Sequence, residues 1–183
     1  DAAHKLVILA SLAFGIPLDV KKVFTEGITK ISTEDVNYAE ELGYRIKHLG
    51  IARRSAGGIE LHVNPTLIPE KRLIANVDGV MNAVLVKGDA VGPTLYYGAG
   101  AGAERTGSSV VGDIVDVART LLADPAHRVP YLGFQDEFVT EQPHLPIEEI
   151  ETAYYLRMQA LDKPGVLSKV ATILSDSGIS IEA

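Results

Sequence analysis

The stretch GIARRSAGGIELHV, residues 50–63, predicts the β-hairpin around which the fold is built. Two short runs of strand-forming residues flank Ser55-Ala56-Gly57-Gly58, where the glycines supply the backbone freedom that a tight connection requires. The next stretch, NPTLIPEKR at 64–72, is bounded by prolines, which predicts a loop. We therefore expect two short antiparallel strands that end before residue 64.

Helical patterns precede the hairpin. Residues 1–14, DAAHKLVILASLAF, predict a helix that is buried on nearly all sides and ends at Gly15. Ser32 or Thr33 predicts the N-cap of a second helix. The apolar face of that helix carries Val36, Ala39 and Leu42.

Two further strands and a helix are expected after the hairpin. Residues 80–87 and 91–97 are β-rich runs on either side of Gly88-Asp89, and residues 106–123 predict a long amphipathic helix. Together these elements indicate an α+β fold for residues 1–123, with a mixed β-sheet covered by helices.

The remainder of the chain predicts a linker and a second, smaller module. Residues 124–150 are rich in Pro, His, Asp and Gln, which is typical of a linker. Residues 151–183 predict a strand, a tight turn, a helix and the start of another strand, a partial β-α-β unit. The turn contains Asp162 and Gly165. It is interpreted either as an ordinary tight turn or as a place where free helix amides receive a small polar ligand.

Composition excludes several classes of function. The chain has 183 residues, a formal net charge of −7 and a pI near 5.2, which argues against a nucleic-acid surface. It has no cysteine, which suits a reducing cytoplasm. The longest apolar run, at 6–18, is shorter than the roughly 20 residues that a membrane span requires. Because the chain starts without methionine and stops within a strand-like segment, we expect it to be part of a longer protein.

A glycine-rich turn, YGAGAGAERTGSS at 97–109, raises the question of a nucleotide site. Gly98, Gly100 and Ala103 formally satisfy the dinucleotide pattern G-x-G-x-x-G/A. That pattern also needs a second parallel strand after the following helix, and here a proline-rich segment follows instead. The alternatives are a dinucleotide cradle or a strand-to-helix turn in which side chains would clash.

Asp1 and Lys5 are spaced so that they lie one helical turn apart on the same face. One interpretation is an ordinary surface ion pair. The other is a lysine that is partly desolvated at the mouth of an apolar helix and transfers a proton. The histidines have no spacing that indicates a metal site; they are His4, His48, His62, His127 and His144.

Several blocks of the sequence, in this order, resemble the substrate-binding and dimerisation region of homoserine dehydrogenase. They are DAAHKLVILASLAFG, EDVNYAEELGYRIKHLGIARR, VNPTLIP, VDGVMNAVLVKGDAVGPTLYYGAGAGAE and VVGDIVDVAR. The C-terminal stretch LRMQALDKPGVLSKVATILSDSGISIEA resembles the start of an ACT domain, a module that senses amino acids. The division implied is a substrate-binding and dimerisation domain at 1–123, a linker at 124–150 and a truncated ACT domain at 151–183.

The resemblance implies NAD(P)-dependent interconversion of L-aspartate 4-semialdehyde and L-homoserine, in threonine and methionine biosynthesis. It assigns proton transfer to Lys5 and substrate binding to Asp1. The glycine turn, through Gly98, Gly100, Ala101 and Gly102, would lie beside the nicotinamide end of NADP or NAD, held mainly by a domain missing from this chain. Asp162 and Gly165 would contact an effector, threonine.

The resemblance further implies a cytoplasmic homodimer or higher homo-oligomer that contacts neither nucleic acid nor membrane. Its dimer contact would involve strands 80–87 and 91–97. One departure is Arg105-Thr106-Gly107, where many relatives have Pro-Thr-Ala; this adds a charge and removes a rigid helix start. The rival hypothesis is a non-catalytic module for dimerisation and amino-acid binding.

Overall fold

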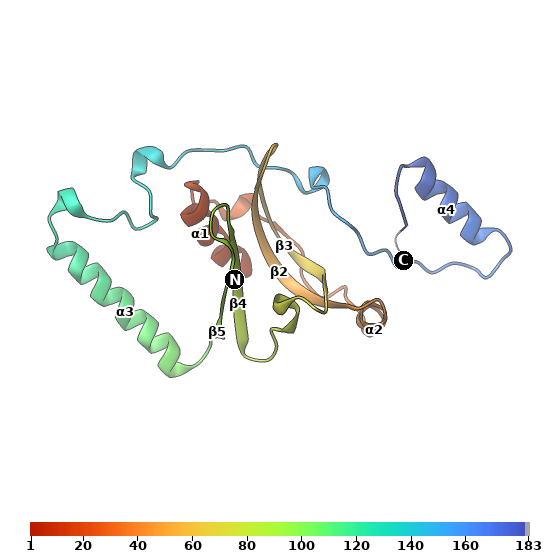
Figure 1. Ribbon diagram of the computed structural model, residues 1–183, viewed down its shortest axis with the longest axis horizontal. Helices are drawn as coiled ribbons and strands as arrows, with labels where there is room; N and C mark the ends of the chain where they lie inside the picture. Colours follow the sequence, from red (N-terminus) through yellow and green to blue (C-terminus); the bar gives the residue numbers. More distant parts are fainter. Residues whose placement is uncertain (182–183) are drawn as a thin grey trace.

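The computed structural model describes residues 1–181, apart from the side chain of His127, and confirms an α+β architecture (Figure 1). Its centre is a three-stranded sheet of order β1-β3-β2. Strand β3 pairs antiparallel with β2 and parallel with β1, so the sheet is mixed as expected. The strands are β1 (Phe24–Thr25), β2 (Tyr44–Ser55) and β3 (Gly58–Pro69).

The central hairpin is longer than the sequence predicts. Its register runs from Ser55 opposite Gly58 to Tyr44 opposite Pro69, so the loop expected at 64–72 is wrong over residues 64–69. β1 pairs with β3 only at His62 and Val63, which leaves β3 as an edge beyond that point. An edge tolerates prolines, because an edge-facing backbone position needs no N–H donor.

Helix α1 (Ala2–Phe14) packs on one face of this hairpin and forms the core with it. Leu6 lies against Gly50 of β2, where an added Cβ would be 3.4 Å from Leu6 Cδ1. Gly15 ends the helix in the left-handed conformation, with φ of 64°. The expectation of burial on nearly all sides is wrong: Ile8 and Leu12 are 48% and 43% exposed. Only one face of the helix meets the sheet.

Helix α2 (Thr33–Glu41) lies against β2 and buries Ala39. Of the two caps considered, Ser32 is the N-cap. Its hydroxyl accepts from the Asp35 amide while the Asp35 carboxylate accepts from the Ser32 amide, a reciprocal capping box. This explains why a helix of only 9 residues is well defined.

The second sheet is a separate hairpin of β4 (Met81–Gly88) and β5 (Gly92–Ala99), as predicted for 80–87 and 91–97. The long helix α3 (Ala103–Leu122) starts earlier than predicted, directly after Gly102. α3 extends away from the central sheet in Figure 1, and none of its residues is buried. It therefore does not cover the sheet within the described part of the chain.

Residues 124–150 contain only short 3-10 turns, consistent with the predicted linker, but they also pack on the core. The Ile59 amide donates to the Pro143 carbonyl, and the Leu145 amide donates to the Ile59 carbonyl. The Thr140 amide likewise donates to the carbonyl of Gly15. This segment is thus hydrogen-bonded to β3 and to the end of α1, and we call residues 124–150 the strap.

The C-terminal module is represented by helix α4 (Val166–Asp176), which lies apart from the sheets in Figure 1. The strand expected from residue 154 onwards is not formed: residues 151–163 have no regular secondary structure. A strand requires a hydrogen-bonded neighbour, and the described residues offer this segment none. Of the predicted β-α-β unit, the structure shows the helix; residues 182–183 lie outside the described range.

Candidate functional site

The Asp1–Lys5 pair stands at the start of α1. Lys5 Nζ donates to Asp1 Oδ2 at 2.7 Å, and the side chains of Lys5 and Asp1 are 70% and 84% exposed. Of the two interpretations, the described residues agree with an exposed ion pair and do not desolvate Lys5, because α1 turns its buried face elsewhere. The structure thus shows a lysine and a carboxylate in direct contact, and residues 1–181 do not enclose them.

The glycine turn joins β5 to α3 and presents bare backbone. A Cβ on Gly100 would lie 2.7 Å from Asn82 Nδ2, whereas the space at Gly98 is open. Gly102 is the N-cap of α3 with φ of 132°, a conformation that disfavours any side chain. The turn thus leaves open space at Gly98, a Cβ at Gly100 would require Asn82 to move, and Gly102 is favoured by its positive φ.

Arg105, where the family resemblance implies a proline, turns back onto this loop. Its Nη1 donates to the Ala101 carbonyl at 3.1 Å. This side-chain hydrogen bond connects the glycine turn to the first turn of α3. A proline at this position would instead restrict the backbone φ angle at the helix start. Strand β5 pairs antiparallel with β4, and α3 leads into the irregular segment 124–150. A self-contained dinucleotide-binding βαβ unit is therefore absent from residues 1–181.

The sequence-predicted site residues fall into three separate places. Within the described chain, no hydrogen bond or ion pair links Asp1 or Lys5 to the glycine turn. Asp162 and Gly165 lie at the start of α4, where Gly165 is the N-cap with φ of 89° and open space around it. The start of α4 has no side-chain cap, and its first amide, from Val166, donates to the Lys163 carbonyl at 3.3 Å.

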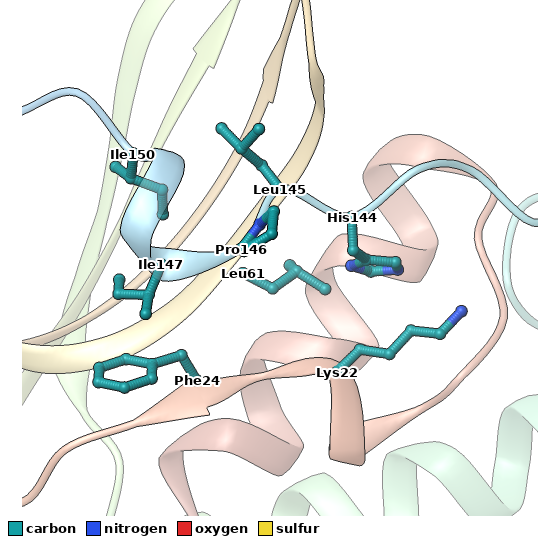
Figure 2. A pocket seen from close by; sticks show the side chains of 8 residues that line it. All are labelled: Lys22, Phe24, Leu61, His144, Leu145, Pro146, Ile147 and Ile150. Atoms are coloured by element: carbon teal, nitrogen blue, oxygen red, sulfur yellow. The ribbon is translucent and has the colours of Figure 1, made fainter.

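A cleft of about 290 Å³ that sequence reasoning missed lies between the strap and β1 (Figure 2). It combines one lysine and one histidine with apolar walls; the lining residues are Lys22, Phe24, Leu61, His144, Leu145, Pro146, Ile147 and Ile150. The His144 Nδ1 is buried without a hydrogen-bond partner. Burial, followed by the nearby Lys22 charge, lowers the pKa of His144. Lys22 itself is paired with Glu141.

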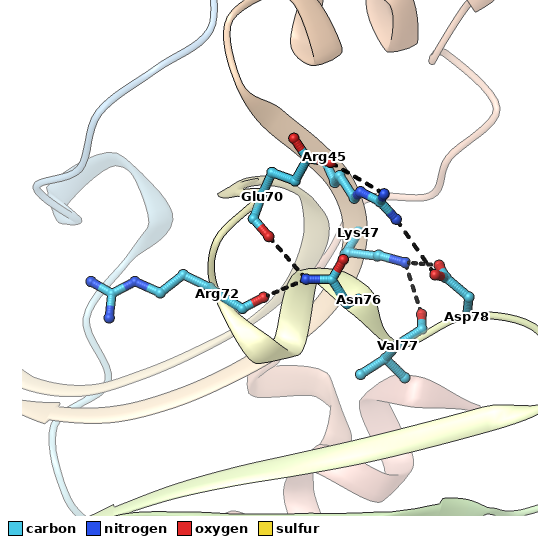
Figure 3. A network of polar contacts seen from close by, with 7 residues as sticks. All are labelled: Arg45, Lys47, Glu70, Arg72, Asn76, Val77 and Asp78. Atoms are coloured by element: carbon cyan, nitrogen blue, oxygen red, sulfur yellow. Dashed lines mark hydrogen bonds and ion pairs between the residues drawn. The ribbon is translucent and has the colours of Figure 1, made fainter.

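A polar network fixes the segment between the two sheets (Figure 3). Lys47 Nζ donates to the Val77 carbonyl at 2.8 Å and to the Asp78 carboxylate at 2.6 Å. Arg45 bonds Glu70 and Asp78, at 3.3 and 3.5 Å. The hydrogen bond from Lys47 is the main cause that lowers the pKa of Asp78. The network thus ties the entry to β4 onto β2.

Neither a metal centre nor a membrane span is found in the part of the chain that the structure describes. No group of three or more His, Cys, Asp or Glu residues is arranged to hold an ion there. None of its helices is both long enough and apolar enough to cross a bilayer.

Residues 1–115 match the sequence profile of the family described as homoserine dehydrogenase, and residues 154–183 match that of the ACT domain. The chain belongs to the homoserine dehydrogenase family. The homoserine dehydrogenase of Pseudomonas aeruginosa is 67% identical over the whole chain, and that of Neisseria gonorrhoeae is 58% identical. The chain covers 42% of each of these relatives.

The fold agrees with solved structures of this family. A homoserine dehydrogenase from Thiobacillus denitrificans superposes with a TM-score of 0.93 at 65% identity, over 100% of this chain and 42% of that one. A homoserine dehydrogenase from S. aureus superposes with a TM-score of 0.60 over 68% of this chain. The chain thus corresponds to less than half the length of the homoserine dehydrogenases that it resembles.

Proposed function

We propose that this chain is the substrate-binding and dimerisation part of an NAD(P)-dependent homoserine dehydrogenase, which interconverts L-homoserine and L-aspartate 4-semialdehyde. The observation that carries the proposal is the 67% identity to a homoserine dehydrogenase along the entire chain. The Asp1–Lys5 pair and the bare glycine turn supply the matching chemistry. Residues 1–123 form the substrate domain, 124–150 the strap and 151–183 the start of the ACT domain.

In this proposal Lys5 is the catalytic residue and Asp1 holds the substrate. The 2.7 Å contact between them orients the lysine and lets the carboxylate receive a substrate amino or hydroxyl group. Oxidation of homoserine releases its hydroxyl proton, which Lys5 accepts as the neutral amine; in the reverse direction the Lys5 ammonium returns it. A pair as exposed as this one is strongly solvated. Catalysis therefore requires that other parts of the intact enzyme cover α1 at Lys5.

The glycine turn fits one wall of a nicotinamide site. Gly98 leaves open space for a flat ring, and Gly100 and Gly102 add no side chains to this part of the turn; Gly102 also has a positive φ of 132°. Gly98, Gly100, Ala101 and Gly102 would offer backbone contacts, and the nicotinamide, when bound, supplies the hydride acceptor. These contacts form one side of a site only, because the described residues contain no pyrophosphate cradle.

The test is Lys5→Ala in the intact enzyme. Loss of a positioned proton-transfer group should lower turnover by about 10²-fold or more, with cofactor affinity little changed. Lys30→Ala is a matched control, because Lys30 also forms an exposed i,i+4 pair, with Glu26 at 3.3 Å. The control should keep wild-type turnover. A wild-type rate in Lys5→Ala would reduce the Asp1–Lys5 contact to a surface ion pair.

Self-association is expected through the β4–β5 hairpin. An isolated two-stranded sheet is marginally stable in water, yet one face of this hairpin carries Leu85 and Tyr97, which are 51% and 56% exposed. Contact with the same hairpin of a second copy would bury these two side chains. We expect a dimer by light scattering at tens of micromolar, and a monomer for Tyr97→Lys. A monomeric wild-type protein would contradict this interface.

The ACT start is proposed to bind an amino-acid effector, threonine, with Asp162 and the amides after Gly165. Support comes from the ACT match and from the uncapped start of α4. Inhibition by threonine that survives substitution of both Asp162 and Gly165 would reject this site. The rival function, a non-catalytic binding module, would instead show threonine binding in an intact protein that does not oxidise homoserine.

A further inference from the structure

The first turn of α2 holds a segment that lies more than a hundred residues away in the sequence. Asp35 accepts a hydrogen bond from the Tyr155 hydroxyl at 3.3 Å and pairs with the Arg157 guanidinium. Arg157 Nε lies 2.7 Å from Oδ1, and Nη2 lies 3.3 Å from Oδ2, so both carboxylate oxygens are engaged. We call Ser32, Asp35, Tyr155 and Arg157 the Asp35 cluster.

This contact is built into a buried position. The Asp35 side chain is only 8% exposed, and Ser32 donates to its Oδ2 from both its amide and its hydroxyl, at 2.8 and 2.9 Å. The backbone bond from Ser32 is the first cause that lowers the pKa of Asp35. Removing Arg157 would leave a buried carboxylate with fewer donors, which is costly.

The segment held by the cluster has almost no other fixed contacts. Within 151–160, no backbone amide takes part in a hydrogen bond that the structure shows. Tyr155 and Arg157 are two residues apart, so in an extended chain they point to the same side. Their neighbours Tyr154 and Leu156 are 77% and 62% exposed. The attachment of this segment therefore depends on two side chains.

Beside the cluster the contact is not close-packed. A cleft of about 370 Å³ is bounded by Tyr38, Glu41 and Leu42 of α2 on one side and by Leu156 and Met158 on the other. The polar contacts are made by Tyr155 and Arg157, whereas Leu156 and Met158, which alternate with them along the chain, line the cleft. Such an attachment can open without disturbing the core, which α1 and the β2–β3 hairpin form elsewhere.

We propose that the first turn of α2 is the docking surface of the ACT module, and that it grips a Tyr-x-Arg segment of the chain through the Asp35 cluster. The module is then held at a defined position on the substrate domain rather than hanging from a free tether. When the cluster breaks, the segment 151–158 detaches while the substrate domain remains folded. The inference is independent of the reaction that the intact protein catalyses.

Limited chymotrypsin digestion of the full chain tests this docking, because Tyr154, Tyr155 and Leu156 are cleavage sites within the held segment. Arg157→Gln should speed cleavage there by about fivefold or more, the factor expected for loss of roughly 1 kcal/mol of attachment. Arg157→Lys, which keeps the charge but loses the planar fork, should lie between it and the wild type. Lys163→Gln is the control, because Lys163 belongs to the same module and makes no contact with Asp35 in the described structure.

A double-mutant cycle of Asp35→Asn and Arg157→Gln distinguishes loss of this contact from a general loss of folding stability. Asp35→Asn keeps an acceptor for Ser32, so α2 should stay capped, and it should speed cleavage as Arg157→Gln does. The effects of the two substitutions should be clearly less than additive, because both break the Asp35–Arg157 contact, while Arg157→Gln also removes a 3.7 Å ion pair with Glu34. Cleavage of Arg157→Gln at the rate of Lys163→Gln would overturn the proposal. Additive effects of Asp35→Asn and Arg157→Gln would overturn it as well.

Discussion

At the scale of single residues, sequence patterns predict which side chains are in contact better than they predict how exposed those side chains are. The i,i+4 spacing correctly placed Asp1 and Lys5 within bonding distance, at 2.7 Å. It could not reveal that Lys5 is exposed, because exposure depends on which face of α1 meets the hairpin. Asp35 and Arg157 were not singled out at all. A Ser-x-x-Asp cap gives no sign of a guanidinium that arrives from a distant segment.

His144 should make stability depend on pH. Its folded pKa lies below the unfolded value of about 6.5, so the unfolded chain binds more protons between the two values. The stability that neutral His144 contributes to the folded state is therefore fully present above about pH 6.5. It is lost as pH falls through the folded pKa of His144. Urea midpoints should fall between pH 7 and 5.5, and less so in His144→Gln. Near pH 8 the urea midpoints of the wild type and of His144→Gln should change with pH to the same extent. If they also changed equally over the acidic range, His144 would not be the source of the pH dependence.

At the scale of elements, local sequence signals predict where helices start and end well, and they predict which strands pair less well. Gly15 and Ser32 end and begin helices as expected. The prolines at 65 and 69 suggested a loop, but an edge position allowed the strand to continue. The expected strand after residue 151 did not form, because strand formation depends on a neighbour that no local pattern specifies. The burial of α3 likewise depends on surfaces outside the described residues.

Helix α2 provides a test at this scale. Ser32→Ala removes the hydroxyl that accepts from the Asp35 amide at 3.3 Å, so it should lower the free energy of unfolding by about 1 kcal/mol. Ser108→Ala on exposed α3 is the control and should change stability by less than about 0.5 kcal/mol. Urea denaturation measures both. A Ser32→Ala protein as stable as the control would show that the capping box contributes nothing to the fold.

At the scale of the whole molecule, the mixed sheet, the second hairpin and the α+β class all followed from the sequence. The strap at 124–150 was predicted as a linker, and its binding to β3 and Gly15 could not be foreseen, since irregular backbone contacts have no sequence period. The Asp1–Lys5 pair and the glycine turn have no hydrogen bond or ion pair between them in the described residues. This separation agrees with a chain that covers 42% of its relatives.

The separation predicts how the 183-residue chain behaves alone. Without a pyrophosphate cradle, it should bind neither NAD nor NADP tightly, since the glycine turn offers one wall only. Calorimetric titration with each cofactor measures this directly. Saturable binding at micromolar concentration would mean that Gly98 to Ala103 is a self-sufficient site and that the proposed division of the cofactor site is wrong.

The most direct measurement is homoserine-dependent reduction of NAD and NADP by the intact protein that carries this chain, with the 183-residue chain assayed beside it. We expect the intact protein to reduce at least one of the two cofactors, in strict dependence on homoserine, and the chain alone to reduce neither. An intact protein that reduces neither cofactor, or a 183-residue chain that turns over homoserine unaided, would contradict this expectation.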